Sequence, residues 1–264
     1  MPARAIWKGT LGMGGGRVAV KLYSAVEDRT VHFHVLEKST LMRIQQHMVN
    51  AETGEEVPGD QVKKGYRAEP GTYVVLTPEE LARTLPEDSR NIEITRFVPS
   101  THIPTPWYDR PYYLAPDDGD SESYFALAEA LGHEKREGVA HWVMRKKRYV
   151  GALRAEGGRL LLITMRFAEE LLSASELPRP AGRAPDAKEL QMAEQLVGAL
   201  EGDFRPADFR DDYRERVLKF IEAKAGGHKP RLQVVARRRE SKSLVASLAA
   251  SIKKARERRE KQVA

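Results

Sequence analysis

The sequence predicts a mainly β protein with added helices, an α+β fold built around a many-stranded barrel. Two observations support this prediction. Apolar and polar residues alternate in short runs over residues 17–76 and again over 139–165, as expected for strands with one buried face. Helical spacing of apolar residues is confined to a few short segments, at 121–131 and beyond residue 185. The first 170 residues should therefore form the barrel, with small helices attached.

The predicted strands of the first half are separated by turn residues. Alternation marks strands at 18–22 and 31–35, and a β-rich run covers 72–76. The glycine-rich stretch 9–16 precedes a strand and lacks the Lys-Ser/Thr pair of a phosphate-binding loop, so we expect a flexible turn before the first barrel strand. Turn residues also occupy 51–54 and 69–71.

A short helix and a long connection follow. Thr77 and Pro78, with two acids after them, predict a helix start after the strand 72–76. A strand is expected over 91–98. The four prolines that follow predict an extended connection without regular pairing, a long arm or surface loop: Pro99, Pro104, Pro106 and Pro111.

The second half of the barrel begins after the helix predicted at 121–131. Strands are expected at 139–144, 149–153 and 160–165, the last two joined by a hairpin turn at Gly157-Gly158. No internal repeat is evident in the sequence.

Four regions follow from these patterns. Residues 1–172 form the barrel core, and the proline-containing stretch 173–185 is a linker. Residues 186–228 hold two amphipathic helices, the second with an apolar stripe from Phe209 to Ile221 that stops at Gly226-Gly227. Residues 229–264 form a basic tail.

Charge is unevenly distributed along the chain. The tail holds 12 basic and 3 acidic residues, a net charge of +9, whereas the preceding 228 residues hold 32 basic and 35 acidic residues, a net charge of −3. Such separation is typical of a segment that binds a polyanion beside a folded body. A tail that only improves solubility is the alternative.

The residues offer little for catalysis. The chain has no cysteine, and His32, His34 and His47 have no further ligand at a recognisable spacing, although three histidines could hold a metal. The acidic residues Asp117 and Asp118, with Asp120, lack a catalytic partner and predict a solvated loop. We expect no enzyme activity, no cofactor and no metal. Without a run of about 18 apolar residues, a cytoplasmic protein with no membrane segment is expected.

Several segments resemble bacterial Ku proteins in register along the chain. The opening Arg4-Ala-Ile-Trp-Lys-Gly9 and the stretch Val20 to Ala25 are similar to the family's first segments. Further matching pieces are Lys64-Gly-Tyr66, Gly71-Thr-Tyr-Val-Val-Leu-Thr77, Ile92-Glu-Ile94, Pro111-Tyr-Tyr-Leu-Ala-Pro116, Ala152-Leu-Arg154 and Leu162-Ile-Thr-Met-Arg-Phe167. Where many relatives carry a cysteine pair, this chain has His47 to Gly54, so no metal is expected there.

The resemblance implies a seven-stranded barrel with an extended bridging arm, two copies of which interlock as a homodimeric ring around double-stranded DNA ends. It implies nucleoid association and sequence-independent phosphate contacts. The residues assigned by position or in the tail are Arg43, Lys63, Lys64, Arg96, Arg145, Lys146, Lys147, Arg148, Arg237, Arg238, Arg239, Lys253 and Lys254. For each of them, an ordinary surface charge is the alternative.

The region after the linker resembles the ligase-binding segment of the family. The resemblance implies a partner, the ATP-dependent DNA ligase of bacterial end joining, ligase D. The expected anchors are Phe209, Tyr213, Arg214, Val217 and Phe220. This stripe could also fold back on the chain's own barrel. The competing functions are a basic-tailed general DNA- or RNA-binding module without end specificity, and a nuclease using the acidic loop.

Overall fold

The structure is a computed structural model that describes residues 4–117, 119, 121–178 and 181–227. It contains two compact units. The first comprises the residues up to Arg29 together with His34–Glu176, and the second comprises Thr30–Phe33 with the residues from Leu177 on. Each unit is described by itself.

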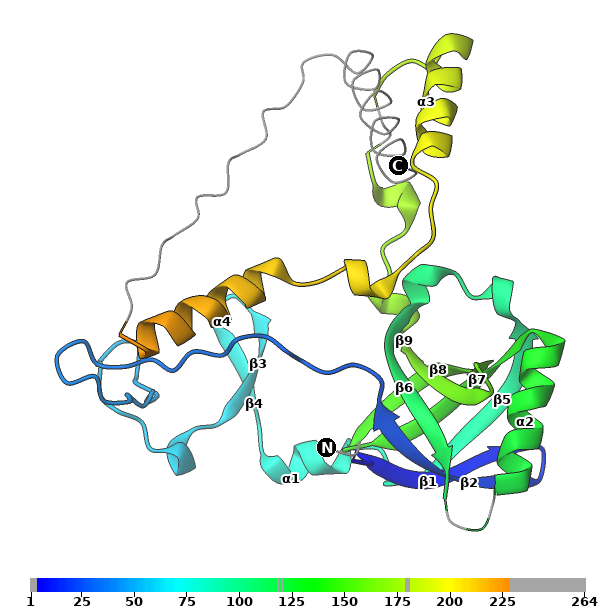
Figure 1. The fold of residues 1–264 in the computed structure, drawn as a ribbon. Helices are drawn as coiled ribbons and strands as arrows, with labels where there is room; N and C mark the ends of the chain where they lie inside the picture. Colours follow the sequence, from blue (N-terminus) through cyan, green and yellow to red (C-terminus); the bar gives the residue numbers. More distant parts are fainter. Residues whose placement is uncertain (1–3, 118, 120, 179–180, 228–264) are drawn as a thin grey trace. The chain divides into compact units, whose positions relative to one another are not determined.

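The first unit is built on a closed seven-stranded barrel (Figure 1), as the sequence and the resemblance predicted. Its strands follow one another around the barrel in the order β1-β2-β6-β9-β8-β7-β5. Every neighbouring pair is antiparallel except β1 and β5, which are parallel. Their bounds are β1 Trp7–Met13, β2 Gly16–Ser24, β5 Asn91–Pro99, β6 Tyr108–Pro116, β7 Arg136–Met144, β8 Lys147–Glu156 and β9 Arg159–Met165.

Helix α2 (Ser121–Glu134), predicted over 121–131, packs its buried face against the barrel core. Tyr124 is almost fully buried, and its hydroxyl donates to the Leu114 carbonyl at 2.6 Å and accepts from the Leu160 N–H at 2.9 Å. Because a buried hydroxyl must find partners, this pair of bonds ties α2 to β6 and β9.

The glycine-rich stretch does not precede the first strand, which corrects our expectation. Residues up to Met13 belong to β1, and only Gly14 and Gly15 form the turn to β2, with positive φ angles of 52° and 96°. A Cβ atom at Gly9 would lie 2.0 Å from the Trp7 ring and 2.2 Å from the Arg90 carbonyl oxygen. Glycine is therefore needed inside this strand because a ring and a backbone approach it closely.

Residues 25–90, which we call the arm, connect β2 to β5. The arm contains β3 (Lys64–Glu69), β4 (Thr72–Leu76) and the helix α1 (Pro78–Arg83), which begins with the predicted Thr77 cap. Strand 72–76 and its turn are confirmed, but the strand predicted over 31–35 is absent. The structure describes every residue of the arm, and none of them is buried.

Two short turns within the arm have the same backbone pattern, a local repeat that the sequence did not reveal. In the first turn unit, residues 35–44, the Glu37 N–H donates to the Met42 carbonyl and the Leu41 N–H donates to the Glu37 carbonyl. In the second turn unit, residues 48–57, the same bonds recur with every residue number raised by 13. Each unit also closes with one isolated β-bridge.

The proline-rich segment is a short crossing instead of the expected long arm. Two 3-10 helices, Ser100–His102 and Thr105–Trp107, lead directly into β6. Pro111 lies within β6 and pairs with Ile163, beside a register shift between Tyr108 and Pro111. A bulge is where a strand tolerates a residue without an N–H donor, so the proline does not exclude pairing.

The second unit contains α3 (Ala187–Ala199) and α4 (Asp212–Ala225). Asp186 caps α3 in a capping box with Glu189, and Asp211 caps α4 through the Arg214 N–H. Helix α4 ends at Ala225, directly before the predicted stop at Gly226-Gly227. Phe209 precedes the helix and is not part of its stripe.

Candidate nucleic-acid interface

The β7–β8 hairpin carries the predicted basic loop at its tip. Met144 pairs with Lys147, so Arg145 and Lys146 are the two central residues of the turn, with φ angles of 52° and 62°. Two-residue hairpin turns of this kind favour Asn-Gly because both positions need a positive φ. A side chain with a Cβ in this region costs roughly 1–2 kcal/mol per residue. The tip therefore holds two cations where local stability would favour other residues.

Lys147 and Arg148 extend the charge of the tip into β8. The Lys147 ammonium lies 5.5 Å from the centre of the Tyr149 ring, and that ring stacks on Trp142 with centres 5.4 Å apart. Trp142 is 2% exposed and belongs to the barrel core. A cation–π contact with a ring that is itself packed on the core orients the lysine head group.

None of the four tip cations has an ion-pair partner among the described residues, and all four are exposed. Some other cations of the first unit, by contrast, lie beside a carboxylate. Lys21 lies 2.6 Å from the carboxylate of Asp117, for example, so part of the predicted acidic loop serves as a counter-ion. The positive charge of the tip is thus uncompensated, as expected for a surface that binds an anion.

A cleft lies beside this tip. Its lining includes Lys147, Arg148 and Tyr149 from β8 and the residues around the end of β9; the remaining members are Asp109, Thr164, Met165, Arg166, Phe167 and Glu170. The polar groups on the β6 and β9 side are already bonded to one another, so the cations of β8 are the ones available to a ligand.

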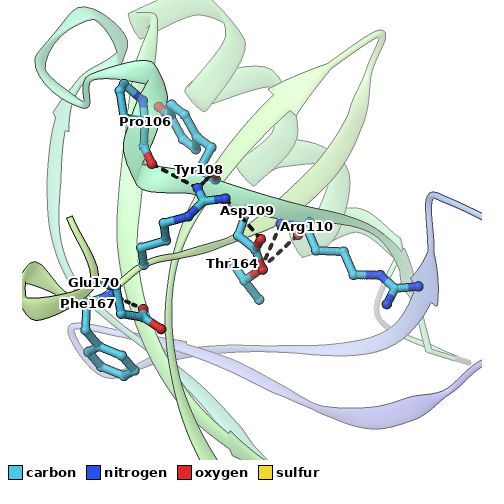
Figure 2. A network of polar contacts seen from close by, with 8 residues as sticks. Pro106, Tyr108, Asp109, Arg110, Thr164, Phe167 and Glu170 are labelled. Atoms are coloured by element: carbon cyan, nitrogen blue, oxygen red, sulfur yellow. Dashed lines mark hydrogen bonds and ion pairs between the residues drawn. The ribbon is translucent and has the colours of Figure 1, made fainter. Parts of the chain in front are cut away.

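Figure 2 shows this network of polar contacts. The Arg166 guanidinium donates to the carbonyl oxygens of Pro106, at 2.9 Å, and of Tyr108, and it lies 3.4 Å from the Asp109 carboxylate. The Thr164 hydroxyl accepts from the Arg110 N–H at 3.0 Å and lies 3.3 Å from the Asp109 carboxylate. Arg166 therefore holds the start of β6 in place, a structural role with no local sequence signal.

A second buried group lies nearby in the same unit. Glu137 is 1% exposed, accepts from the Tyr108 hydroxyl at 2.7 Å and pairs with Arg154 at 3.1 Å. Burial of Tyr108, together with Glu137 beside it, raises the pKa of that phenol to about 12. These contacts join β6, β7 and β8, and sequence reasoning missed them because their partners lie far apart in the chain.

The other predicted DNA contacts occupy different places. Arg96 does not lie in the arm. It lies in barrel strand β5 and pairs with Val139 of β7. Lys63 and Lys64 are neighbours at the start of β3, and Arg43 lies in the first turn unit. All four are exposed. The predicted contacts Arg237, Arg238, Arg239, Lys253 and Lys254 lie outside the described residues.

The predicted partner site divides into two pieces. Tyr213, Val217 and Phe220 share one face of α4 at helical spacing, with Arg214 next to them. Phe209 instead stacks on Phe204, with ring centres 5.1 Å apart, and both rings are more than 70% exposed. Phe204 is thus a further candidate anchor that the sequence analysis did not single out.

The described part of the chain contains no group of three or more histidine, cysteine, aspartate or glutamate side chains that could hold a metal ion. The predicted strand that would have aligned His32 and His34 is absent. Among the helices in the described ranges, none is long and apolar enough to cross a membrane.

Comparisons with known proteins agree with the barrel. The family model described as the Ku70/Ku80 beta-barrel domain matches residues 13–192. The proteins named "Non-homologous end joining protein Ku" from Coxiella burnetii and Anaeromyxobacter sp. are 36% and 40% identical over 228 and 226 residues. Each alignment covers 85% of this chain, with 83% and 76% of the relative. The protein of that name from Archaeoglobus fulgidus is 31% identical over 250 residues, which are 94% of this chain and 98% of the relative.

The family model covers more than half of the chain, and these relatives match it over most of their own length. The closed barrel and the sequence segments quoted above agree with this match. The chain therefore belongs to the Ku family.

Proposed function

We propose that this chain binds the ends of double-stranded DNA without regard to sequence, as a homodimeric ring, in non-homologous end joining, and that it does so without catalysis. The uncompensated cations of the Arg145–Lys146 turn carry the proposal. Contacts to phosphates are independent of base sequence, which suits a protein that must bind any broken end. The names of its relatives point to the same pathway.

The arm supports the homodimer. Fifteen of its large apolar side chains are exposed, although soluble monomers rarely expose large apolar patches. The two-stranded sheet of β3 and β4 exposes Tyr66 on one face and Tyr73 on the other. An isolated two-stranded sheet is only marginally stable, so both faces favour a partner. We infer that a second copy of the chain covers part of this surface and completes the ring.

DNA topology provides the test. The chain should be titrated in moderate salt, with competitor DNA, against a linear duplex, a covalently closed circle and a linear duplex with both ends blocked. A ring requires binding to the open linear DNA alone. Equal binding to the closed circle would favour the alternative, a general basic-tailed DNA- or RNA-binding module, and magnesium-dependent shortening of the duplex would indicate a nuclease.

The tail should contribute through charge. If about six of its 12 basic residues contact phosphates, the binding constant should fall by roughly 10³-fold or more between 50 and 200 mM salt. Removal of residues 229–264 should weaken binding and flatten that dependence. An unchanged salt slope would leave the tail with a solubilising role.

Recruitment of an ATP-dependent DNA ligase is the second part of the proposal, and the exposed aromatic residues of the second unit support it. Phe209→Ala and Tyr213→Ala should each weaken ligase binding by about 10-fold or more, because exposed aromatic anchors dominate many interfaces. Leu190→Ala on α3, where the leucine is 51% exposed, is the matched control. DNA-end binding should survive all three changes, so ligase binding that also survives them would place the contact elsewhere.

A further inference from the structure

The two turn units of the arm, residues 35–44 and 48–57, differ at the one position where their backbone is most demanding. The fifth residue of the hydrogen-bonded turn has a positive φ in both units, 57° at Leu41 and 72° at Gly54. Glycine adopts this conformation freely, and leucine does so at a cost. The second unit therefore has the residue that the backbone favours, and the first unit does not.

The exposure of the Leu41 side chain to solvent is also unfavourable for a large apolar residue. Its side chain is 71% exposed, and the side chain of Met42 beside it is 69% exposed. The matching residues of the second unit are Gly54 and Glu55, which suit an exposed turn. Two large apolar side chains at an exposed tip bring no stability to the turn itself. Exposed apolar side chains of this kind mark a contact with another molecule.

The local charge indicates what that contact is. Residues 35–57 hold four acidic and two basic residues, and the whole arm holds 12 acidic and 8 basic residues. The net negative charge of this surface disfavours a DNA phosphate backbone even with Arg43 in the unit, whereas a protein surface can accept both the apolar tip and its acidic surroundings. Exposed cations of the barrel outside the β7–β8 tip, such as Arg136 and Arg159, offer complementary charge on every copy of the chain.

We propose that Leu41, with Met42, is an anchor of the homodimer: the tip of the first turn unit inserts into an apolar site on the second copy. This inference rests on the proposed homodimer and names residues that hold it together. Burial in the second copy offsets both the left-handed backbone of Leu41 and its exposure in the single chain. The glycine-bearing second unit is then the ordinary version of the same turn.

Sedimentation velocity over a dilution series of the full chain tests this proposal with two variants. Leu41→Ala keeps the backbone strain and removes the side chain, and Leu41→Gly removes both. Each should raise the dimer dissociation constant by about 10²-fold or more, because a two-fold interface loses the buried leucine twice. The thermal melting of the barrel should stay unchanged, since Leu41 is not part of the core.

Leu172→Ala is the matched control, because Leu172 is 81% exposed and lies outside the arm. It should leave the dimer unchanged. If the two Leu41 variants dimerise as the wild type does, the anchor is wrong while the homodimer stands. If they remain dimers but lose DNA affinity, Leu41 contacts DNA and the proposal is overturned. A monomeric wild type would instead refute the homodimer itself.

Discussion

The barrel and the arm differ in what stabilises them. The barrel buries its apolar side chains in one cluster, which includes Leu11, Ile92, Trp142 and Leu162. The arm is of substantial length, from residue 25 to 90, and buries none. A segment without a core cannot offset the conformational entropy that it loses on ordering. The difference teaches that packing around its own core stabilises the barrel, whereas the arm has no core of its own to stabilise it.

The largest effect is expected when a buried side chain of the barrel core is shortened. Leu162→Ala removes a fully buried side chain and should lower the free energy of unfolding by about 3 kcal/mol. Val75→Ala in the arm, where the valine is 52% exposed, should change it by less than about 0.5 kcal/mol. Urea unfolding at low protein concentration measures both. Similar losses would mean that arm and barrel share one core.

The second largest difference between barrel and arm is expected when a glycine is replaced by alanine. A Cβ atom at Gly151 would lie 2.6 Å from the Ile163 carbonyl oxygen and 2.8 Å from the Trp142 ring, so Gly151→Ala should cost roughly 2 kcal/mol of unfolding free energy. Gly59→Ala in the arm meets nothing within 4 Å and should be close to neutral. Thermal melting of both variants provides the measurement. A tolerated Gly151→Ala would contradict the tight packing described here.

The basic tip of the barrel should sharpen the comparison by separating stability from binding. Arg145→Asn with Lys146→Gly gives the turn its preferred residues and should stabilise the chain by about 1 kcal/mol. The same change should weaken DNA binding. It should also reduce, by about 2, the slope of the logarithm of the binding constant against the logarithm of the salt concentration.

The control for that double change is Arg145→Gln with Lys146→Gln, which removes the charges and keeps the strain. It should lose the same DNA affinity without gaining stability. If the Asn-Gly variant gains stability and keeps full DNA affinity, the tip is a mere surface turn.

The smallest expected effect concerns pH. The pKa of Tyr108 is about 12 in the folded chain, above the ordinary value of 10.0, so folding favours the protonated phenol. Its contribution is fully present below pH 10 and is lost as the pH rises toward 12. After allowance for solvent screening, we expect a loss of the order of 1 kcal/mol.

Tyr108→Phe should reduce the pH dependence of urea unfolding between pH 10 and 12, because this phenol then releases no proton. A smaller dependence should remain, since burial also raises the pKa of Tyr112 and of Tyr124. Trp107→Phe, which changes a neighbour without a titrating group, should leave the pH dependence as in the wild type. A steep loss that persists in Tyr108→Phe would assign the effect to other groups.

The sequence predicted the barrel strands well because alternation reports a buried face directly. The same signal failed over 31–35, where Val31, Phe33 and Val35 alternate but find no neighbouring strand. Alternation indicates that one side of a segment is apolar, but it does not indicate which other part of the protein covers that side. In the arm, that cover is not provided by the chain's own core.

The missed site features are long-range contacts. Arg166 bonds to residues about 60 positions earlier, and Glu137 meets Tyr108 across 29 positions. Neither pair has a local signal. The basic tip was predicted by position from the resemblance to bacterial Ku proteins, but its left-handed backbone and the Tyr149 ring beside Lys147 became visible only in three dimensions. The stacking of Phe204 on Phe209 likewise depends on the chain path before α4.

The parallel pairing of β1 with β5 has a mechanical consequence. It involves three residue pairs, from Thr10 with Asn91 to Gly12 with Glu93, whereas every other pair of neighbouring barrel strands has five or more. The arm is attached to the barrel at the end of β2 and at the start of β5. A pulling force on the arm therefore acts on the barrel beside its shortest strand pairing. Under such a force, the barrel should open first between β1 and β5.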